Sequence, residues 1–135
     1  ENVLQTGSST IEALRGLRAA GFGVALDDFG TGYSSLVSLE QLPLTRVKLD
    51  RALIASVDTS PRSLAIARAI VGLCQGLGLE ITAEGVETTD QLSNLRRLGV
   101  DHAQGYYFSP PLPADAIAEF LEANRSFVAL ASAAD

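Results

Sequence analysis

Apolar residues along the chain follow two patterns that alternate from one end to the other. Short runs made almost wholly of apolar residues predict strands covered on both faces, as in a parallel sheet. One such run occupies residues 22–26, and we predict three further strands at 45–49, 79–83 and about 102–106, where polar residues stand among the apolar ones. Between them, apolar residues recur every three to four positions, which predicts helices that pack one face against the sheet.

Caps, prolines and glycines mark the ends of the predicted helices. Ser9 and Glu12 have the spacing of a capping box, and Gly21 ends the helix that follows. Hydroxyl side chains or prolines open the other helices. These starts are Ser34 or Ser35, Ser60 with Pro61, Thr88 and Pro113. Strand and helix thus alternate throughout, which predicts an α/β fold with a parallel sheet and right-handed crossovers.

The residues that follow each strand distinguish an open sheet from a barrel. All four predicted strands end in polar residues, as strands do at the active-site end of a (β/α)8 barrel. These residues are Asp27 and Asp28, Lys48, Glu84 and Gln104. We therefore predict half of a (β/α) barrel with about four parallel strands. A half-barrel leaves two strand edges and an apolar inner face exposed, so we expect a homodimer or other self-association.

Two adjacent carboxylates at a strand end repel each other unless they are solvated, protonated or bridged by cations. Asp27 and Asp28 therefore indicate a divalent metal site, and the alternative is a capped, solvated loop. Lys48 has an alternative role as the structural ion-pair partner of either aspartate. The alternative for Glu84 and Glu87 is a solvated position near the N-terminus of a helix.

Length and charge narrow the class of protein. At 135 residues the chain is one domain, predicted over residues 1–128 with an alanine-rich tail at 129–135. Its formal charge of -6 argues against duplex nucleic acid as a partner, because such binding needs clustered lysine and arginine. No apolar run approaches the ~20 residues of a membrane span and no signal peptide is evident, so we expect a cytoplasmic protein.

Two single residues have structural interpretations. Cys74 is the only cysteine and follows a helical apolar pattern, so we predict that it fills the core. His102 is the only histidine and has no second histidine or cysteine at ligand spacing, which favours a structural role. The chain contains no methionine and opens on Glu1, and we therefore expect it to be a segment excised from a longer protein.

Five stretches of the sequence match a known family in order and spacing. They are residues 27–36 (DDFGTGYSSL), 42–43 (LP), 47–51 (VKLDR), 84–88 (EGVET) and 104–106 (QGY). On these stretches the chain resembles the C-terminal half of the EAL family, the cyclic di-GMP phosphodiesterases of bacterial signalling. The resemblance implies a modified TIM barrel that hydrolyses cyclic di-GMP to linear pGpG with two Mg2+ or Mn2+ ions.

The resemblance also implies roles for individual residues. Asp27 corresponds to the carboxylate that bridges the metals, and Asp28 to a ligand of the second metal. Lys48 corresponds to the lysine that meets the attacking water and the phosphate. Glu84 corresponds to a glutamate that is a metal ligand or general base. Lys48, Glu84 and Asp28 are therefore the implied catalytic residues, and two cations held by such carboxylates can activate water for an in-line displacement.

Four further residues are implied as supports of the substrate or the site. Gln104 and Glu87 match supporting residues of the family. Glu1 matches the last glutamate of a Glu-x-Thr-Glu strand end, which anchors the loop over residues 29–35. Tyr33 is a candidate for stacking on guanine, and the alternative is packing at the barrel rim.

Other parts of the family's site precede this segment. The Glu-Ala-Leu strand, a metal-binding asparagine and a further glutamate belong to the N-terminal half of the domain. Glu12-Ala13-Leu14 spells the signature, but it lies within the predicted first helix and outside the motif order. We therefore expect the chain alone to have little or no activity and to need the N-terminal half as its partner. Any membrane anchor of the parent protein is expected upstream.

Two other functions are alternatives to the phosphodiesterase. The first is a catalytically degenerate module that binds cyclic di-GMP or mediates dimer contacts through the loop after Asp28. The second is a receiver-like signalling domain, which also pairs acidic residues with a lysine. The order of residues argues against the receiver, because Lys48 comes one strand after the aspartates and Glu84 follows it.

Overall fold

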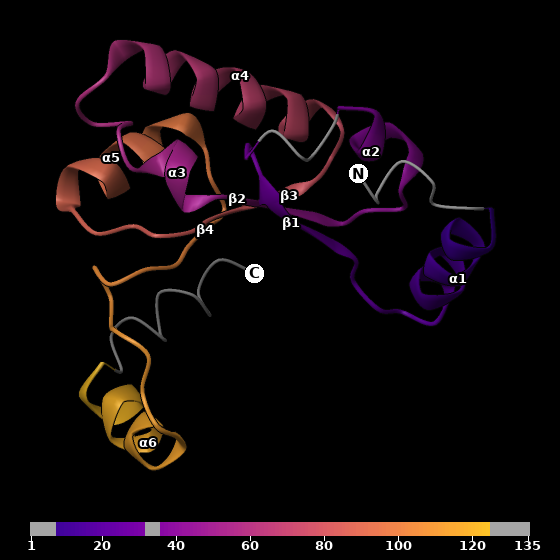
Figure 1. Ribbon diagram of the computed structural model, residues 1–135. Helices are drawn as coiled ribbons and strands as arrows, with labels where there is room; N and C mark the ends of the chain where they lie inside the picture. The colour runs from indigo at the N-terminus through magenta and orange to yellow at the C-terminus, as the bar shows by residue number, and fades with distance from the viewer. Residues whose placement is uncertain (1–7, 32–35, 125–135) are drawn as a thin grey trace.

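The computed structural model describes residues 8–31 and 36–124 and contains one four-stranded sheet. All three strand pairs are parallel, and the strands lie side by side in chain order (Figure 1). The strands are β1 (Ala25–Phe29), β2 (Arg46–Leu49), β3 (Glu80–Ala83) and β4 (His102–Ala103). Consecutive parallel strands joined by helices are the arrangement of a barrel wall, so the predicted α/β half-barrel is confirmed.

Helices cover one side of this sheet. Figure 1 shows α3, α4 and α5 on the same side, whereas α1 and α6 lie apart, beyond opposite ends of the sheet. The helices are α1 (Ser8–Ala19), α2 (Leu36–Gln41), α3 (Arg51–Ile54), α4 (Pro61–Gly76), α5 (Thr89–Leu98) and α6 (Ala114–Ala123). None of the helices in the described part of the chain is long and apolar enough to cross a membrane.

The core lies between the sheet and the helices that cover it. Val47 and Leu49 alternate with polar neighbours along β2 and are fully buried. They belong to one cluster with Val71 and Cys74 of α4 and Ile81 of β3. Alternate residues of a strand point to opposite faces, so one face of β2 packs against the helix layer. Cys74 therefore fills the core as predicted, and burial raises the pKa of its thiol.

The opposite face of the sheet is polar, which corrects the expectation of an apolar inner face. Arg46 and Lys48 alternate with the buried residues of β2. Arg46 pairs with Glu80 of β3 at 2.5 Å, and His102 of β4 lies 3.8 Å from the same carboxylate. The apolar content of the strands is concentrated on the helix side, and period-two alternation puts the charges on the open side. Self-association remains a prediction.

Several predicted boundaries shift in the structure. β1 begins at Ala25 rather than at Phe22, which is 60% exposed, and β4 spans two residues instead of five. The first helix begins at Ser8, so the capping box predicted at Ser9 is wrong, because Ser9 is already helical. Its sequence Glu12-Ala13-Leu14 is indeed helical. The cap predicted at Ser34 or Ser35 falls outside the described residues.

Two predicted helix starts are confirmed in detail. Ser60 caps α4 by accepting a hydrogen bond from the Ser63 N–H, with Pro61 as the first helical residue. Thr88 and Gln91 form a reciprocal capping box at the start of α5, and Gly99 ends that helix in the left-handed region. These caps satisfy backbone groups that a helix terminus would otherwise leave unpaired.

Gly105 provides a test of the packing between β4 and the loop after β3. Its φ is +157°, and a Cβ at this position would overlap the backbone nitrogen and oxygen of Val86. We expect Gly105→Ala to lower the free energy of unfolding by about 3 kcal/mol, measured by urea denaturation. Gly72→Ala is the control, because nothing lies within 4 Å of its Cβ position in α4. A Gly105→Ala protein as stable as the Gly72→Ala protein would contradict this packing.

Candidate functional site

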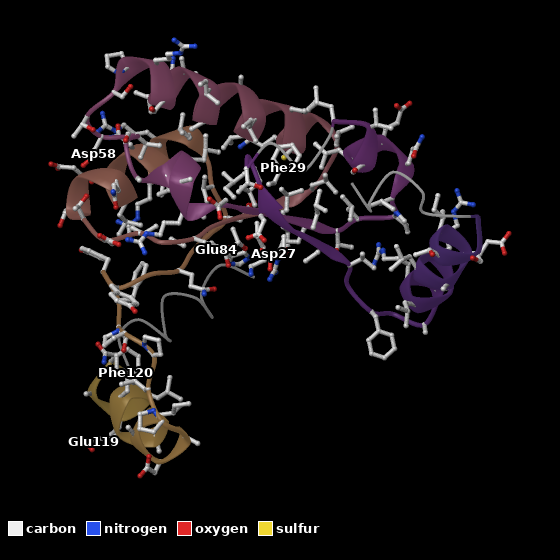
Figure 2. The ribbon with its side chains drawn as sticks, in the orientation of Figure 1. Asp27, Phe29, Asp58, Glu84, Glu119 and Phe120 are labelled. Atoms are coloured by element: carbon white, nitrogen blue, oxygen red, sulfur yellow. The ribbon has the colours of Figure 1, made fainter. Side chains whose placement is uncertain are left out.

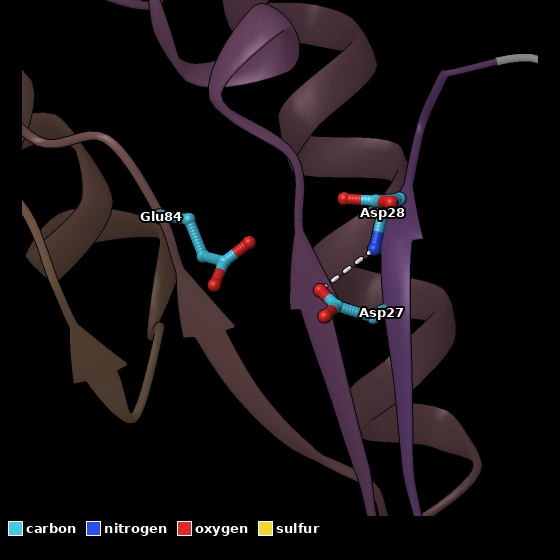
Figure 3. A group of neighbouring side chains, drawn as sticks. All are labelled: Asp27, Asp28 and Glu84. Atoms are coloured by element: carbon cyan, nitrogen blue, oxygen red, sulfur yellow. Dashed lines mark hydrogen bonds between the residues drawn. The ribbon is translucent and has the colours of Figure 1, made fainter.

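The end of β1 contains an extra residue that brings two carboxylates to one side. Leu26 pairs with Val47 and Phe29 with Leu49, so Asp27 and Asp28 together span the single position of Lys48 on β2. Adjacent side chains of a regular strand point to opposite faces, and a bulge with one residue in the left-handed region changes this alternation. Asp28 has a φ of +54°. Figure 3 shows both aspartates extending from β1 toward Glu84.

Local hydrogen bonds hold this bulge. The Asp28 N–H donates to Asp27 Oδ1 at 2.9 Å, and the Thr31 hydroxyl donates to the Asp28 carbonyl at 3.0 Å. Aspartate tolerates the left-handed region better than most residues, because its short side chain bonds locally. The sequence placed the aspartates after a strand at 22–26, whereas they lie within β1 itself. The strand was predicted too early because a bulge leaves no periodic apolar signal.

Glu84 completes an acidic cluster with the two aspartates, from the end of β3, which is separated from β1 by β2. Its N–H donates to the Leu49 carbonyl at 3.0 Å, which fixes it directly beyond the end of β3. Asp27, Asp28 and Glu84 each offer a carboxylate oxygen, and these oxygens lie within 4.8 Å of one another. Figure 2 shows Asp27 and Glu84 together on the open side of the sheet. Such a set of hard oxygen donors fits Mg2+ or Mn2+.

Lys48 lies between these carboxylates on β2. Its Nζ is 2.5 Å from Glu84 Oε1 and 3.3 Å from both carboxylate oxygens of Asp27. The pKa of Lys48 is raised, and the hydrogen bond to Glu84 is the largest cause. Burial lowers this pKa, and the hydrogen bond to Asp27 raises it further. The structural ion pair weighed as an alternative is therefore present, and it neutralises part of the negative charge of the cluster.

The raised pKa of Lys48 predicts a dependence of stability on pH. Because its folded pKa lies above the ordinary 10.5, the ammonium stabilises the fold below that pH and ceases to do so as pH rises through the folded pKa. We expect Lys48→Met to melt at a lower temperature than the wild type at pH 7 and low salt, with the difference shrinking as the pH rises above 10.5 and through the folded pKa. Circular dichroism measures the melting temperatures of the two proteins at each pH. Equal melting temperatures at pH 7 would contradict the prediction.

The remaining predicted site residues are not all brought together. Gln104 follows β4, and its backbone bonds to Ala83 and Val86 hold it at the same edge of the sheet. Glu87 lies at the entry to α5, where it pairs with Arg51 at 2.9 Å instead of joining the acidic cluster. Glu1 and Tyr33 lie outside the described residues. The sequence missed α3 and its Arg51, although Asp50 has the side chain of a helix cap.

His102 lies two residues before Gln104, in a second charged group on the open face. Arg46 Nη2 is 3.5 Å from its Nε2, and both residues approach Glu80. The hydrogen bond from Arg46, more than any other contact, lowers the pKa of Glu80. This arrangement links β2, β3 and β4, consistent with the structural role predicted for His102.

Comparison with known proteins assigns this chain to a family. The family model described as "EAL domain" matches residues 1–111, most of the chain. The chain belongs to the EAL domain family. It is 49% identical, over 116 residues, to the cyclic di-GMP phosphodiesterase NbdA of Pseudomonas aeruginosa. That match covers 86% of this chain and 15% of NbdA.

Solved structures of EAL proteins share the fold. The EAL enzyme Bd1971, in its cAMP- and cyclic-di-GMP-bound form, matches with a TM-score of 0.84 and 33% identity over 90% of this chain and 32% of that one. Klebsiella pneumoniae BlrP1, in a manganese/cyclic-di-GMP complex, matches with a TM-score of 0.73 and 36% identity over 81% of this chain and 28% of that one. This EAL chain therefore spans less than a third of either structure.

Proposed function

We propose that the chain forms one wall of the two-metal site of a cyclic di-GMP phosphodiesterase that produces linear pGpG. The observation that carries the proposal is the convergence of Asp27, Asp28 and Glu84, with carboxylate oxygens within 4.8 Å of one another. The proposed substrate is supported by the similarity to NbdA, a cyclic di-GMP phosphodiesterase. The proposed metal dependence is supported by the similarity to BlrP1, whose structure is a complex with manganese and cyclic di-GMP.

Asp27, Asp28 and Glu84 are the residues that would hold Mg2+ or Mn2+. When bound, such ions acidify a water molecule and neutralise the phosphate. Glu84 would accept the proton of the water, because its carboxylate belongs to the cluster and its side chain is still 19% exposed. Lys48 would donate to a phosphate oxygen once a cation shares its carboxylate partners, which supplies positive charge to an otherwise acidic chain.

Gln104, Glu87, Glu1 and Tyr33 are proposed supports of this site. The further ligands that the family resemblance implies, two glutamates and an asparagine, are not supplied by the described cluster. We therefore propose that residues 1–135 alone turn over little or no cyclic di-GMP and act with the N-terminal half of an EAL domain. A cytoplasmic location and a homodimer are parts of the same proposal.

Calorimetric titration tests this function. Cyclic di-GMP and Mn2+ are titrated into the chain alone and into its mixture with a matching N-terminal half of the domain, and pGpG is measured by chromatography. Binding and pGpG formation only in the mixture would support the split two-metal site. Turnover by the chain alone near that of a complete domain would refute the proposed division of the site.

A second candidate is a catalytically degenerate module that binds cyclic di-GMP or mediates dimerisation. The ion pairs of Lys48 with Asp27 and Glu84 favour it, because they stabilise the carboxylates without any metal. This function predicts cyclic di-GMP binding without pGpG formation in the assembled mixture. Light scattering over a range of concentrations tests self-association, and a stable monomer throughout would count against a dimer.

A further inference from the structure

The short helix α3 lies beside two turns, one after the aspartates of β1 and one after Glu84. It follows β2, the strand of Lys48, directly. Its cap residue Asp50 accepts a hydrogen bond from the Ala52 N–H at 2.7 Å. The Asp50 N–H donates to the Phe29 carbonyl at 3.1 Å. The start of α3 is thus fixed to the end of β1, directly after the two aspartates.

One side chain of α3 packs on the turn that follows the aspartates. A Cβ added to Gly30 would lie 3.5 Å from both Cβ and Cδ2 of Leu53. Gly30 has a φ of +109°, a conformation that residues with a Cβ rarely adopt. Leu53 is half-buried and packs against the hydrophobic core. It therefore connects the Asp28–Gly30 turn to the core.

A second side chain of α3 lies over the turn that follows Glu84. Gly85 has a φ of +70°, and a Cβ there would overlap Cγ of Arg51 and lie 2.7 Å from its Cβ. The aliphatic stem of Arg51 therefore covers the Gly85 backbone, and its guanidinium continues to Glu87 Oε1 at 2.9 Å. Arg51 thus contacts this turn at Gly85 and at Glu87.

We infer that α3 is a brace that sets the separation between the Asp27–Asp28 pair and Glu84, with Arg51 and Leu53 as positioning residues. The inference rests on the proposed metal site. Both turns contain a glycine at positive φ beside a side chain of α3. Gly85 leaves room for the stem of Arg51, and Leu53 lies at van der Waals distance from the Cβ position of Gly30. Metal ligands need well-defined positions, and residues that orient them strongly affect metal affinity without touching the ion.

Stability and metal affinity are expected to respond differently to changes in the brace. The Arg51 and Glu87 side chains are 71% and 47% exposed, and an exposed ion pair stabilises a fold only weakly. Loss of Arg51 should therefore leave the melting temperature of the metal-free protein nearly unchanged. The same loss frees the Glu84–Glu87 turn, so Mn2+ affinity should fall and amide exchange in that turn should become faster.

The test compares four variants of the whole chain. Arg51→Ala is expected to weaken Mn2+ binding about tenfold in calorimetry and to accelerate hydrogen exchange at residues 84–87 in the metal-free protein. Arg51→Lys keeps the stem and a charge and should restore most of the affinity. Glu87→Gln removes only the ion pair and should have a smaller effect. Arg62→Ala, an exposed arginine in the first turn of α4, is the matched control and should bind as the wild type does.

The outcomes separate this inference from the proposed function. A wild-type chain that binds no Mn2+ at millimolar concentration refutes the metal site in the chain alone. In that case, faster exchange at residues 84–87 in Arg51→Ala still supports the brace, and unchanged exchange overturns it. If the wild type binds Mn2+ and Arg51→Ala binds it equally well, the inference is wrong.

Discussion

Asp28→Asn is expected to weaken Mn2+ binding to the chain by about 100-fold or more, the upper end of what residues that only orient ligands contribute. Asparagine adopts the left-handed region as readily as aspartate, so the bulge at φ +54° should persist. The substitution then removes one negative charge and one anionic oxygen from the cluster without changing the backbone. Calorimetric titration with Mn2+ measures the change.

Two comparisons isolate the role of the Asp28 carboxylate. Asp115→Asn, in the first turn of α6, removes an equal charge far from the cluster and should leave Mn2+ affinity unchanged. Asp28→Ala should bind as weakly as Asp28→Asn and should also be less stable, because alanine is disfavoured at positive φ. Mn2+ affinity that is equal in the wild type and in Asp28→Asn would exclude Asp28 as a ligand.

Glu84→Gln is expected to reduce pGpG formation by about 10²–10⁴-fold in the mixture of the chain with an N-terminal half of the domain. Glutamine keeps the shape of the side chain but neither accepts a proton well nor provides an anionic ligand. It also removes the 2.5 Å ion pair that holds Lys48. Chromatographic assay of pGpG at saturating cyclic di-GMP and Mn2+ gives the rate.

The control for Glu84 is Glu119→Gln. Glu119 is an exposed residue of α6, and Figure 2 shows it far from Asp27 and Glu84. This variant should hydrolyse cyclic di-GMP at the rate of the wild type. Full activity of Glu84→Gln, with assembly of the two halves verified, would mean that another group activates the water.

Much of the fold could be predicted from the sequence because short strand segments alternate with helices that carry periodic apolar positions, caps and glycine stops. The segments predicted at 45–49 and 79–83 agree with β2 and β3 to within one residue. The polar residues at the strand ends were expected at one end of the barrel, and Lys48 and Glu84 lie together there. The ends of the sheet were predicted less well, because β1 is bulged and β4 has only two residues.

The sequence by itself determined the alternation of strands and helices, the caps of α4 and α5, and the types of residue at the strand ends. Only the tertiary structure decided how these residues meet. The bulge that turns Asp27 and Asp28 to one side depends on pairing with β2, and α3 is too short to show a helical period. The brace exists because Gly30 and Gly85 lie against side chains distant in the chain, and such contacts leave no local pattern.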